Sequence, residues 1–131
     1  MELLLDTCSL LWALFDDKKL PESVREMLKN IDNDVYVSSA SLWEIAIKNA
    51  KHPDLMPYSL DDVYNVIINY TDYIVLPIRP NHLLVLDEII KQNIHQDPFD
   101  HIIMATSQVE NLPLITSDSN IKHYKGIKIL S

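Results

Sequence analysis

Glycine is almost absent from this sequence, because Gly126 is the only one among 131 residues. Phosphate-binding loops of the Rossmann and P-loop types need several glycines at fixed spacing, since their backbone must approach the phosphate closely. Nucleotide binding through a loop of either type is therefore excluded.

Cysteine and long apolar runs are also scarce. Cys8 is the only cysteine, so the chain can form no internal disulfide, and no tetrad of Cys and His has zinc-finger spacing. This usage is typical of a reducing compartment. The first apolar residues follow no basic segment and are interrupted by Asp6. We therefore expect neither a secretory signal nor a membrane span, and a cytoplasmic location.

Positive charge is in deficit as well. The chain has 11 Lys and Arg against 19 Asp and Glu, which gives a formal net charge of −8. A broad electrostatic grip on nucleic acid normally needs a basic face, so this balance argues against one. Acids that surround a bound cation nevertheless reverse the local field. The positions of the acids therefore matter more than their number.

The rest of the composition is that of an ordinary globular protein. Hydrophobic residues make up 47% of the chain and charged residues 23%, which excludes the disordered, collagen-like and coiled-coil classes. A chain of this length can bury a core without disulfides or structural metal. We therefore expect residues 1–131 to form one domain.

Short apolar runs alternate with segments of helical periodicity along the whole chain. The expected strands cover residues 2–5, 35–37, 74–78, 114–116 and 127–130. The expected helices cover residues 9–15, 22–30, 60–70, 81–92 and 97–109, and a further helix starts within 38–41 and ends near 50. The helix over 81–92 is expected to bury a stripe made of Leu83, Leu84, Leu86, Ile89 and Ile90. This alternation predicts an α/β/α sandwich with a mainly parallel sheet of about five strands.

Several acidic residues fall where strands end or where helices begin beside them. Asp6 and Asp118 each follow an apolar strand, and the carboxyl ends of parallel strands form the edge at which ligands bind. Glu44 lies in a helix that is apolar nearly all round, where an unpaired carboxylate is costly. Asp100 lies in the first turn of a helix for which Asp97 is a good N-cap. Asp97 is thus open to two interpretations, a cap alone or a further acid of the site.

Carboxylates gathered in one pocket repel one another. At an effective dielectric near 20, each pair about 4 Å apart costs roughly 4 kcal/mol, and the whole fold is stable by only about 5–15 kcal/mol. A divalent cation removes this cost. Oxygen-rich coordination suits Mg²⁺ or Mn²⁺, and water on such an ion can attack a phosphodiester.

Four motifs stand along the chain in a fixed order, namely Leu5-Asp6-Thr7 with Leu11 to Leu14, Ser38 to Lys48, His95 to Asp100, and Leu114 to Asp118. In this order they resemble the motifs of the PIN-domain ribonucleases, and most closely those of the VapC-type toxins of bacterial toxin–antitoxin pairs. Each motif is weak alone, but the four together span nearly the whole chain. The resemblance implies a PIN-like nuclease domain.

The resemblance also implies roles for individual residues. The catalytic acids around Mg²⁺ or Mn²⁺ are Asp6, Glu44, Asp100 and Asp118, and Asp97 is a fifth metal ligand. The residues that support the site through hydroxyl groups are Thr7 and Thr116. The family cleaves RNA by metal-activated water, forms dimers and is held inactive by a cognate antitoxin whose tail fills the active-site groove. We therefore expect an endoribonuclease toxin that is a homodimer with an antitoxin partner.

The lysines near these motifs are each open to two interpretations, whereas the histidines and the cysteine are given no catalytic role. Lys48 lies four residues after Glu44, so it either forms an ion pair with it or orients it and contacts a phosphate. Lys122 and Lys125 either guide RNA or belong to the solvated surface. The five histidines form no metal set by spacing, and we assign no catalytic role to those beside Asp100. Cys8 is expected to be a small buried side chain.

Two alternatives to a nuclease remain open. Receiver domains also gather acids around Mg²⁺ at the strand ends of a parallel α/β fold, and they accept a phosphoryl group. Such a domain needs an acidic pair after its first strand, whereas Asp6 is followed here by Thr7 and Cys8. It also needs an aspartate after a central strand, whereas the expected central strands are closed by Ser38 and Pro80. The other alternative is a PIN fold without catalysis that acts only as a binding module.

Overall fold

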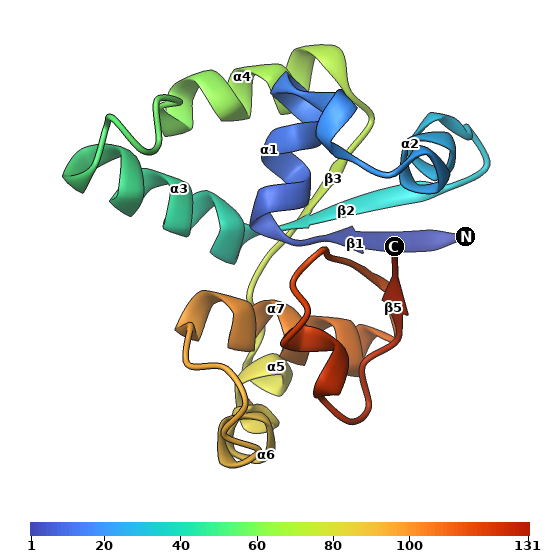
Figure 1. Cartoon of the computed structure of the whole chain (residues 1–131), viewed down its shortest axis with the longest axis vertical. Helices are drawn as coiled ribbons and strands as arrows, with labels where there is room; N and C mark the ends of the chain where they lie inside the picture. The colour runs from blue at the N-terminus through green and yellow to red at the C-terminus, as the bar shows by residue number, and fades with distance from the viewer.

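The computed structural model describes all 131 residues and contains one sheet in which every pair of neighbouring strands is parallel (Figure 1). The strands are β1 (Glu2–Leu5), β2 (Asp34–Ser38), β3 (Ile74–Leu76), β4 (Leu114–Ile115) and β5 (Ile129–Leu130). Their order is β3-β2-β1-β4-β5, so β1 is central. The predicted parallel sheet of five strands is confirmed.

Helices cover both faces of the sheet, as predicted for an α/β/α sandwich (Figure 1). The helices on one face are α1 (Thr7–Phe15), α2 (Glu22–Lys29), α3 (Ser39–Lys51) and α4 (Leu60–Tyr70). The helices on the other face are α5 (Pro80–Leu84), α6 (Leu86–Lys91) and α7 (Pro98–Glu110). Two 3₁₀ turns complete the fold, η1 (Asp17–Lys19) and η2 (Ile121–His123). None of the helices is long and apolar enough to cross a membrane.

The two faces of the sheet carry separate hydrophobic cores. Successive side chains of a strand point to opposite faces, so Leu3 and Leu5 enter one core while Leu4 enters the other. The first core is closed by residues such as Ile45 of α3, and the second by residues such as Met104 of α7. Because β1 contributes side chains to both cores, its carboxyl end is fixed in position, and Asp6 directly follows that end.

Shortening a side chain of β1 is expected to destabilise the fold. Leu4→Ala removes most of a side chain that is 0% exposed, and such changes cost about 2–5 kcal/mol because they leave a cavity. Leu84→Ala is the matched control, since Leu84 is 82% exposed. Urea unfolding followed by circular dichroism measures both. Equal losses in the two variants would contradict the assignment of Leu4 to the core.

One prediction for the second face is wrong. The single helix expected over residues 81–92 is divided at Val85 into α5 and α6, and of the expected stripe only Ile89 is fully buried. His82 takes the inward position instead, with Nδ1 accepting from the backbone N–H of Arg79 at 3.0 Å and Nε2 lying 2.9 Å from Glu110 Oε1. These bonds turn α5 so that its leucines face outward, which residue spacing alone does not indicate.

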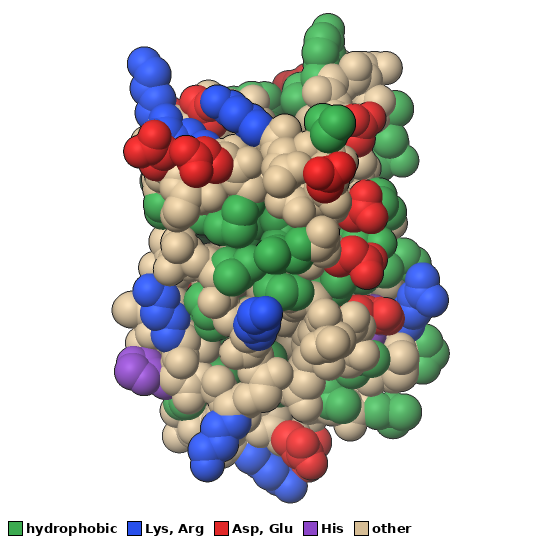
Figure 2. Space-filling model, turned by 90° about the vertical axis from the view of Figure 1, so that its right-hand side faces the viewer, with side chains coloured by type: hydrophobic (Ala, Val, Ile, Leu, Met, Phe, Trp, Pro, Cys, Tyr) green, Lys and Arg blue, Asp and Glu red, His purple; other side chains and the backbone are tan.

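Charged side chains are mixed over the surface. On the face in Figure 2, Lys and Arg side chains are dispersed and Asp and Glu side chains lie among them. This face has no continuous basic patch, in agreement with the net charge of −8.

Candidate active site

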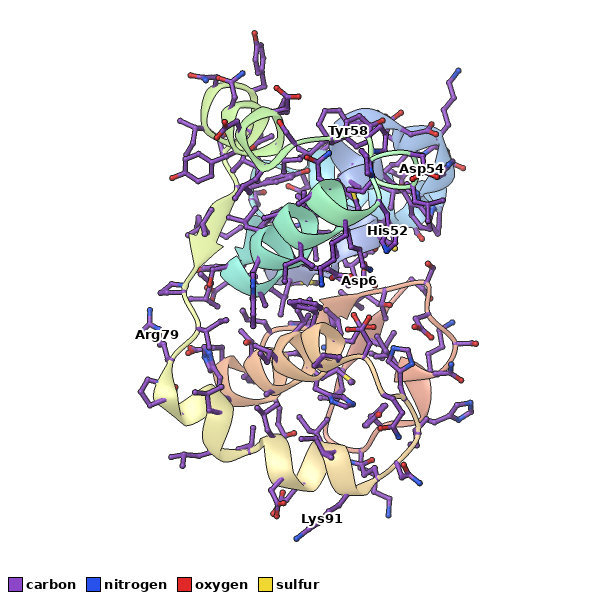
Figure 3. The ribbon with its side chains drawn as sticks, turned by 90° about the vertical axis from the view of Figure 1, so that its left-hand side faces the viewer. Asp6, His52, Asp54, Tyr58, Arg79 and Lys91 are labelled. Atoms are coloured by element: carbon purple, nitrogen blue, oxygen red, sulfur yellow. The ribbon has the colours of Figure 1, made fainter.

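A hollow of about 320 Å³ opens at the carboxyl ends of β1 and β4, where the start of α7 faces α3. Figure 3 looks onto this side, and Asp6 lies there between the two helical layers. The acids in the wall of the hollow are Asp6, Glu44, Asp97, Asp100 and Asp118. The other lining residues are Thr7, Cys8, Lys48, His95 and Ser117. The fold thus brings together all five acids singled out in the sequence.

Asp6 is fixed by its place between β1 and α1. It is the N-cap of α1, and its Oδ1 accepts the backbone N–H of Ser9 at 2.8 Å. Burial raises the pKa of the Asp6 carboxyl above its usual value. Hydrogen bonds from Ser9 and Thr116 oppose this increase, and the charge of Asp118 adds to it. The carboxylate is therefore held in an unfavourable environment while no cation neutralises it.

Glu44 is buried on α3, and two neighbours, Thr7 and Lys48, contact its carboxylate. Thr7 Oγ1 lies 2.7 Å from Glu44 Oε1 and 2.9 Å from Ser41 Oγ. Since a carboxylate only accepts, the Thr7 hydroxyl donates to Glu44 and leaves Ser41 to donate to Thr7. Lys48 forms the predicted ion pair with Glu44 Oε2. Burial lowers the pKa of the Lys48 ammonium, but the Glu44 carboxylate outweighs it and the pKa is raised.

Loss of the Thr7 hydroxyl is expected to destabilise the metal-free protein by about 1–3 kcal/mol, because Thr7→Val leaves a buried carboxylate oxygen of Glu44 without its donor. Valine keeps the shape of threonine, so the packing around it stays the same. Thr7→Ser is the control that retains the hydroxyl. Urea unfolding of both variants without dication measures the difference. A Thr7→Ser loss as large as that of Thr7→Val would show that the hydrogen bond is not the cause.

The start of α7 contributes two carboxylates. Asp97 is the N-cap, as predicted, and its Oδ1 accepts the backbone N–H groups of Phe99 at 2.9 Å and Asp100 at 3.4 Å. Its other oxygen has no hydrogen bond and is available to a ligand. Asp100 Oδ2 lies 2.8 Å from His95 Nε2. Burial raises the pKa of Asp100 to about 6, against the effect of the His95 hydrogen bond and helped by the charge of Asp97.

Asp118 is positioned by the turn after β4. Its backbone N–H donates to Thr116 Oγ1 at 3.1 Å, and its Oδ1 accepts the N–H of Asn120 at 2.8 Å. Its Oδ2 lies 3.7 Å from His95 Nε2. Thr116 itself is 2% exposed and does not line the hollow. Its hydroxyl accepts the backbone N–H of Asp118 and also forms a hydrogen bond with Asp6, so it supports both acids.

Other predicted residues lie apart from the acids or differ from expectation. Lys122 and Lys125 are exposed and do not line the hollow, so Lys48 is its only lysine. The prediction that Cys8 is buried is wrong, because Cys8 is exposed at the rim. Desolvation and then the charges of the neighbouring acids raise the pKa of its thiol to about 11. The thiol therefore stays protonated and is a poor nucleophile.

Sequence reasoning misses two residues of this site. His95 lies in the hollow with Asp97 and Asp100, and ligand atoms of the three lie within 4.8 Å of one another. Ser41 is hydrogen-bonded to Thr7, which in turn donates to Glu44. The signal for His95 is its place two residues before the N-cap of α7, at the same edge of the sheet. Ser41 has a comparable signal, since it precedes Glu44 by three residues on one helix.

The donor set fits a divalent cation. Five carboxylates meet one ammonium in the hollow, and the pKa values of Asp6 and Asp100 are raised by burial and by neighbouring acids. Hard dications such as Mg²⁺ and Mn²⁺ prefer oxygen ligands. A larger hollow of about 440 Å³ at the amino ends of the strands has only two acids in its lining, Asp34 and Asp72. It offers no comparable concentration of charge.

Comparisons with known proteins give the family. A family model described as the PIN domain matches residues 3–127, and the chain therefore belongs to the PIN domain family. None of the curated proteins matches the chain significantly.

Solved structures are similar to this chain over its whole length. VapBC from Salmonella typhimurium, bound to DNA, gives a TM-score of 0.72 at 19% identity and covers 99% of this chain and 97% of that chain. VapBC2 from Rickettsia felis, bound to a promoter DNA fragment, gives 0.71 at 15% identity with coverages of 99% and 98%. VapBC-5 from Mycobacterium tuberculosis, a member of a family of toxin–antitoxin systems, gives 0.61 at 18% identity with coverages of 98% and 98%. These likenesses show the shared fold.

Proposed function

We propose that this protein is a dication-dependent endoribonuclease, the toxin of a bacterial toxin–antitoxin pair. The observation that carries the proposal is the meeting of five carboxylates in one hollow of a PIN fold. Such crowding is costly unless a cation is bound, and the donor set suits Mg²⁺ or Mn²⁺. The similar solved structures of toxin–antitoxin complexes favour the same class.

The proposal assigns roles to the residues of the hollow. Asp6, Glu44, Asp100 and Asp118 are the catalytic acids, and Asp97 is a further ligand through the oxygen that does not cap α7. The dication, when bound, acts as a Lewis acid that activates water and stabilises charge on the phosphate. Thr7 fixes the orientation of Glu44 by donating a hydrogen bond to it, and Thr116 supports Asp6 in the same way. Lys48, the only ammonium there, offsets negative charge as a phosphate enters.

The proposed partners are RNA, a cognate antitoxin and a second copy of the chain. The proteins described as VapBC are the support for an antitoxin here. A homodimer is supported by large apolar side chains left exposed on α4, namely Tyr64, Ile68 and Tyr70 at 47%, 57% and 78%. We propose a cytoplasmic location, where RNA is available. Lys122 and Lys125 remain candidates for distant RNA contacts.

The test is an RNA cleavage assay with purified protein. End-labelled single-stranded and structured RNAs are incubated with Mg²⁺, with Mn²⁺, or with EDTA. We expect cleavage with a dication that leaves 5′-phosphate and 3′-hydroxyl ends, none with EDTA, and recovery when the dication is restored. Asp118→Asn, purified in the same way, controls for a contaminating nuclease. Cleavage that survives EDTA or this substitution would overturn the proposal.

The same preparation separates the alternatives. Uptake of a phosphoryl group from a small acyl phosphate, without RNA cleavage, would favour a receiver-like signalling domain. Neither cleavage nor uptake, with normal folding, would favour a PIN fold that serves only as a binding module. The absence of an acidic pair beside Asp6 already argues against the receiver.

A further inference from the structure

We propose that His95 is a nitrogen ligand to the dication of this hollow, and that it makes the chain favour transition dications such as Mn²⁺ and Co²⁺ over Mg²⁺. The inference rests on the proposed function only in placing a dication among the acids. It goes beyond it by naming a sixth ligand residue that is not an acid and by setting the choice of ion.

The geometry points to His95 because its imidazole lies among the acids. Ligand atoms of His95, Asp97 and Asp100 lie within 4.8 Å of one another, close enough for one ion to contact all three. Nε2 is 2.8 Å from one oxygen of Asp100 and 3.7 Å from one oxygen of Asp118. His95 is also the only histidine in the lining. The imidazole thus faces two of the proposed ligands from a single nitrogen.

The backbone of His95 is held by side chains from outside the hollow. Its N–H donates to the Tyr124 hydroxyl at 2.8 Å, and that hydroxyl donates to its carbonyl at 3.0 Å. The same carbonyl lies 2.6 Å from His101 Nε2. Tyr124 and His101 are both buried. This residue between α6 and α7 therefore presents its side chain from a fixed point, which a metal ligand requires.

An imidazole changes which ions the hollow prefers. Neutral imidazole offers one nitrogen lone pair, a good ligand for first-row transition ions, and its contribution grows along the series from Mn²⁺ to Co²⁺ and Ni²⁺. Mg²⁺ gains little from nitrogen, because it prefers oxygen ligands and retains its water. A hollow lined by carboxylates alone would not favour transition dications over Mg²⁺ beyond the general order of metal affinities. The nitrogen should therefore add selectivity as well as affinity.

A different role for His95 makes a different prediction. If His95 only holds Asp100 in place by a hydrogen bond, its loss should weaken every dication by a similar factor. If His95 is a ligand, the loss should be small for Mg²⁺, larger for Mn²⁺ and largest for Co²⁺. The ratio of these losses therefore distinguishes a ligand from a positioning residue.

The first experiment measures dication binding to the whole chain without RNA. Titration calorimetry with Mg²⁺, Mn²⁺ and Co²⁺ is applied to the wild type, to His95→Asn, which removes the imidazole nitrogen that faces the acids, and to His123→Asn, a control at an exposed histidine outside the hollow. We expect His95→Asn to weaken Mn²⁺ and Co²⁺ about tenfold or more and Mg²⁺ less than about threefold. Equal losses for the three ions, or no dication binding, would overturn the inference.

The second experiment needs no variant and remains decisive if His95→Asn fails to fold. Pulsed electron paramagnetic resonance of wild-type protein with one equivalent of Mn²⁺ should show nitrogen coupling that changes when histidine is labelled with ¹⁵N. Absence of this coupling would overturn the inference. If the coupling is present but RNA is not cleaved, the inference stands and the nuclease proposal fails. If RNA is cleaved but the coupling is absent, the nuclease proposal stands and the inference about His95 fails.

Discussion

Asp6→Asn is expected to reduce dication-dependent RNA cleavage by about 10²–10³-fold or more, the usual effect of removing one group that stabilises charge in a transition state. Asp6 directly follows the central strand, and the residue is 6% exposed. Asparagine caps a helix about as well as aspartate, so the bond to Ser9 N–H is retained. What the variant loses is one negative charge at the proposed dication, and cleavage should fall with no loss of folding.

The measurement for Asp6→Asn pairs initial cleavage rates with thermal unfolding. In the absence of dication the variant should be as stable as the wild type or more so, because burial disfavours the Asp6 charge. Asp61→Asn, at an exposed acid in the first turn of α4, should leave both quantities unchanged. Full cleavage activity in a folded Asp6→Asn protein would remove Asp6 from the catalytic acids.

The parts of the fold that could be predicted are those governed by local patterns. The apolar run before Asp6 forms a strand because it is buried on both faces, and parallel strands bring Asp6 and Asp118 to one edge. Asp97 and Asp100 follow from the helix-start pattern around Pro98. These features depend on residues close together in the sequence. For them, periodicity and capping were sufficient.

The parts that could not be predicted depend on contacts between distant residues. His82 displaces the leucines of α5 from the core because Glu110, 28 residues later, accepts its bond. His95 is fixed in the hollow by Tyr124, 29 residues later. Neither contact leaves a periodic signal. A histidine beside an acidic helix start is therefore ambiguous until the chain is folded.

The cost of the crowded acids also connects the site to the stability of the whole protein. A cation-binding hollow made of carboxylates is a region where the metal-free fold loses free energy, and the raised pKa values of Asp6 and Asp100 report this loss. The residues that make the hollow suitable for a dication are those that weaken the fold without it. Metal binding and folding are then linked.

Metal-free protein is expected to lose stability as the pH rises from about 4 to 7. Asp100 has a folded-state pKa of about 6, above its ordinary value of 3.8. Between these two values the folded state binds more protons than the unfolded state, so the free energy of unfolding falls with rising pH. The shift corresponds to about 3 kcal/mol, or roughly 10 °C in Tm for a chain of this size. Asp100→Asn should remove most of this pH dependence and raise Tm at pH 7.

Saturating dication should reverse the loss at pH 7, because an ion at 100 times its Kd adds about 2.7 kcal/mol to the folded state. Thermal unfolding at pH 4.5 to 7.5, with EDTA or with Mn²⁺, measures both effects in the wild type, in Asp100→Asn and in Asp54→Asn, whose acid is exposed on a loop (Figure 3). The exposed-acid control should behave as the wild type does. A metal-free wild type whose Tm rises steadily from pH 4.5 to 7.5 would mean that the Asp100 carboxylate is not disfavoured by its surroundings, and that the hollow has no unneutralised charge for a dication to relieve.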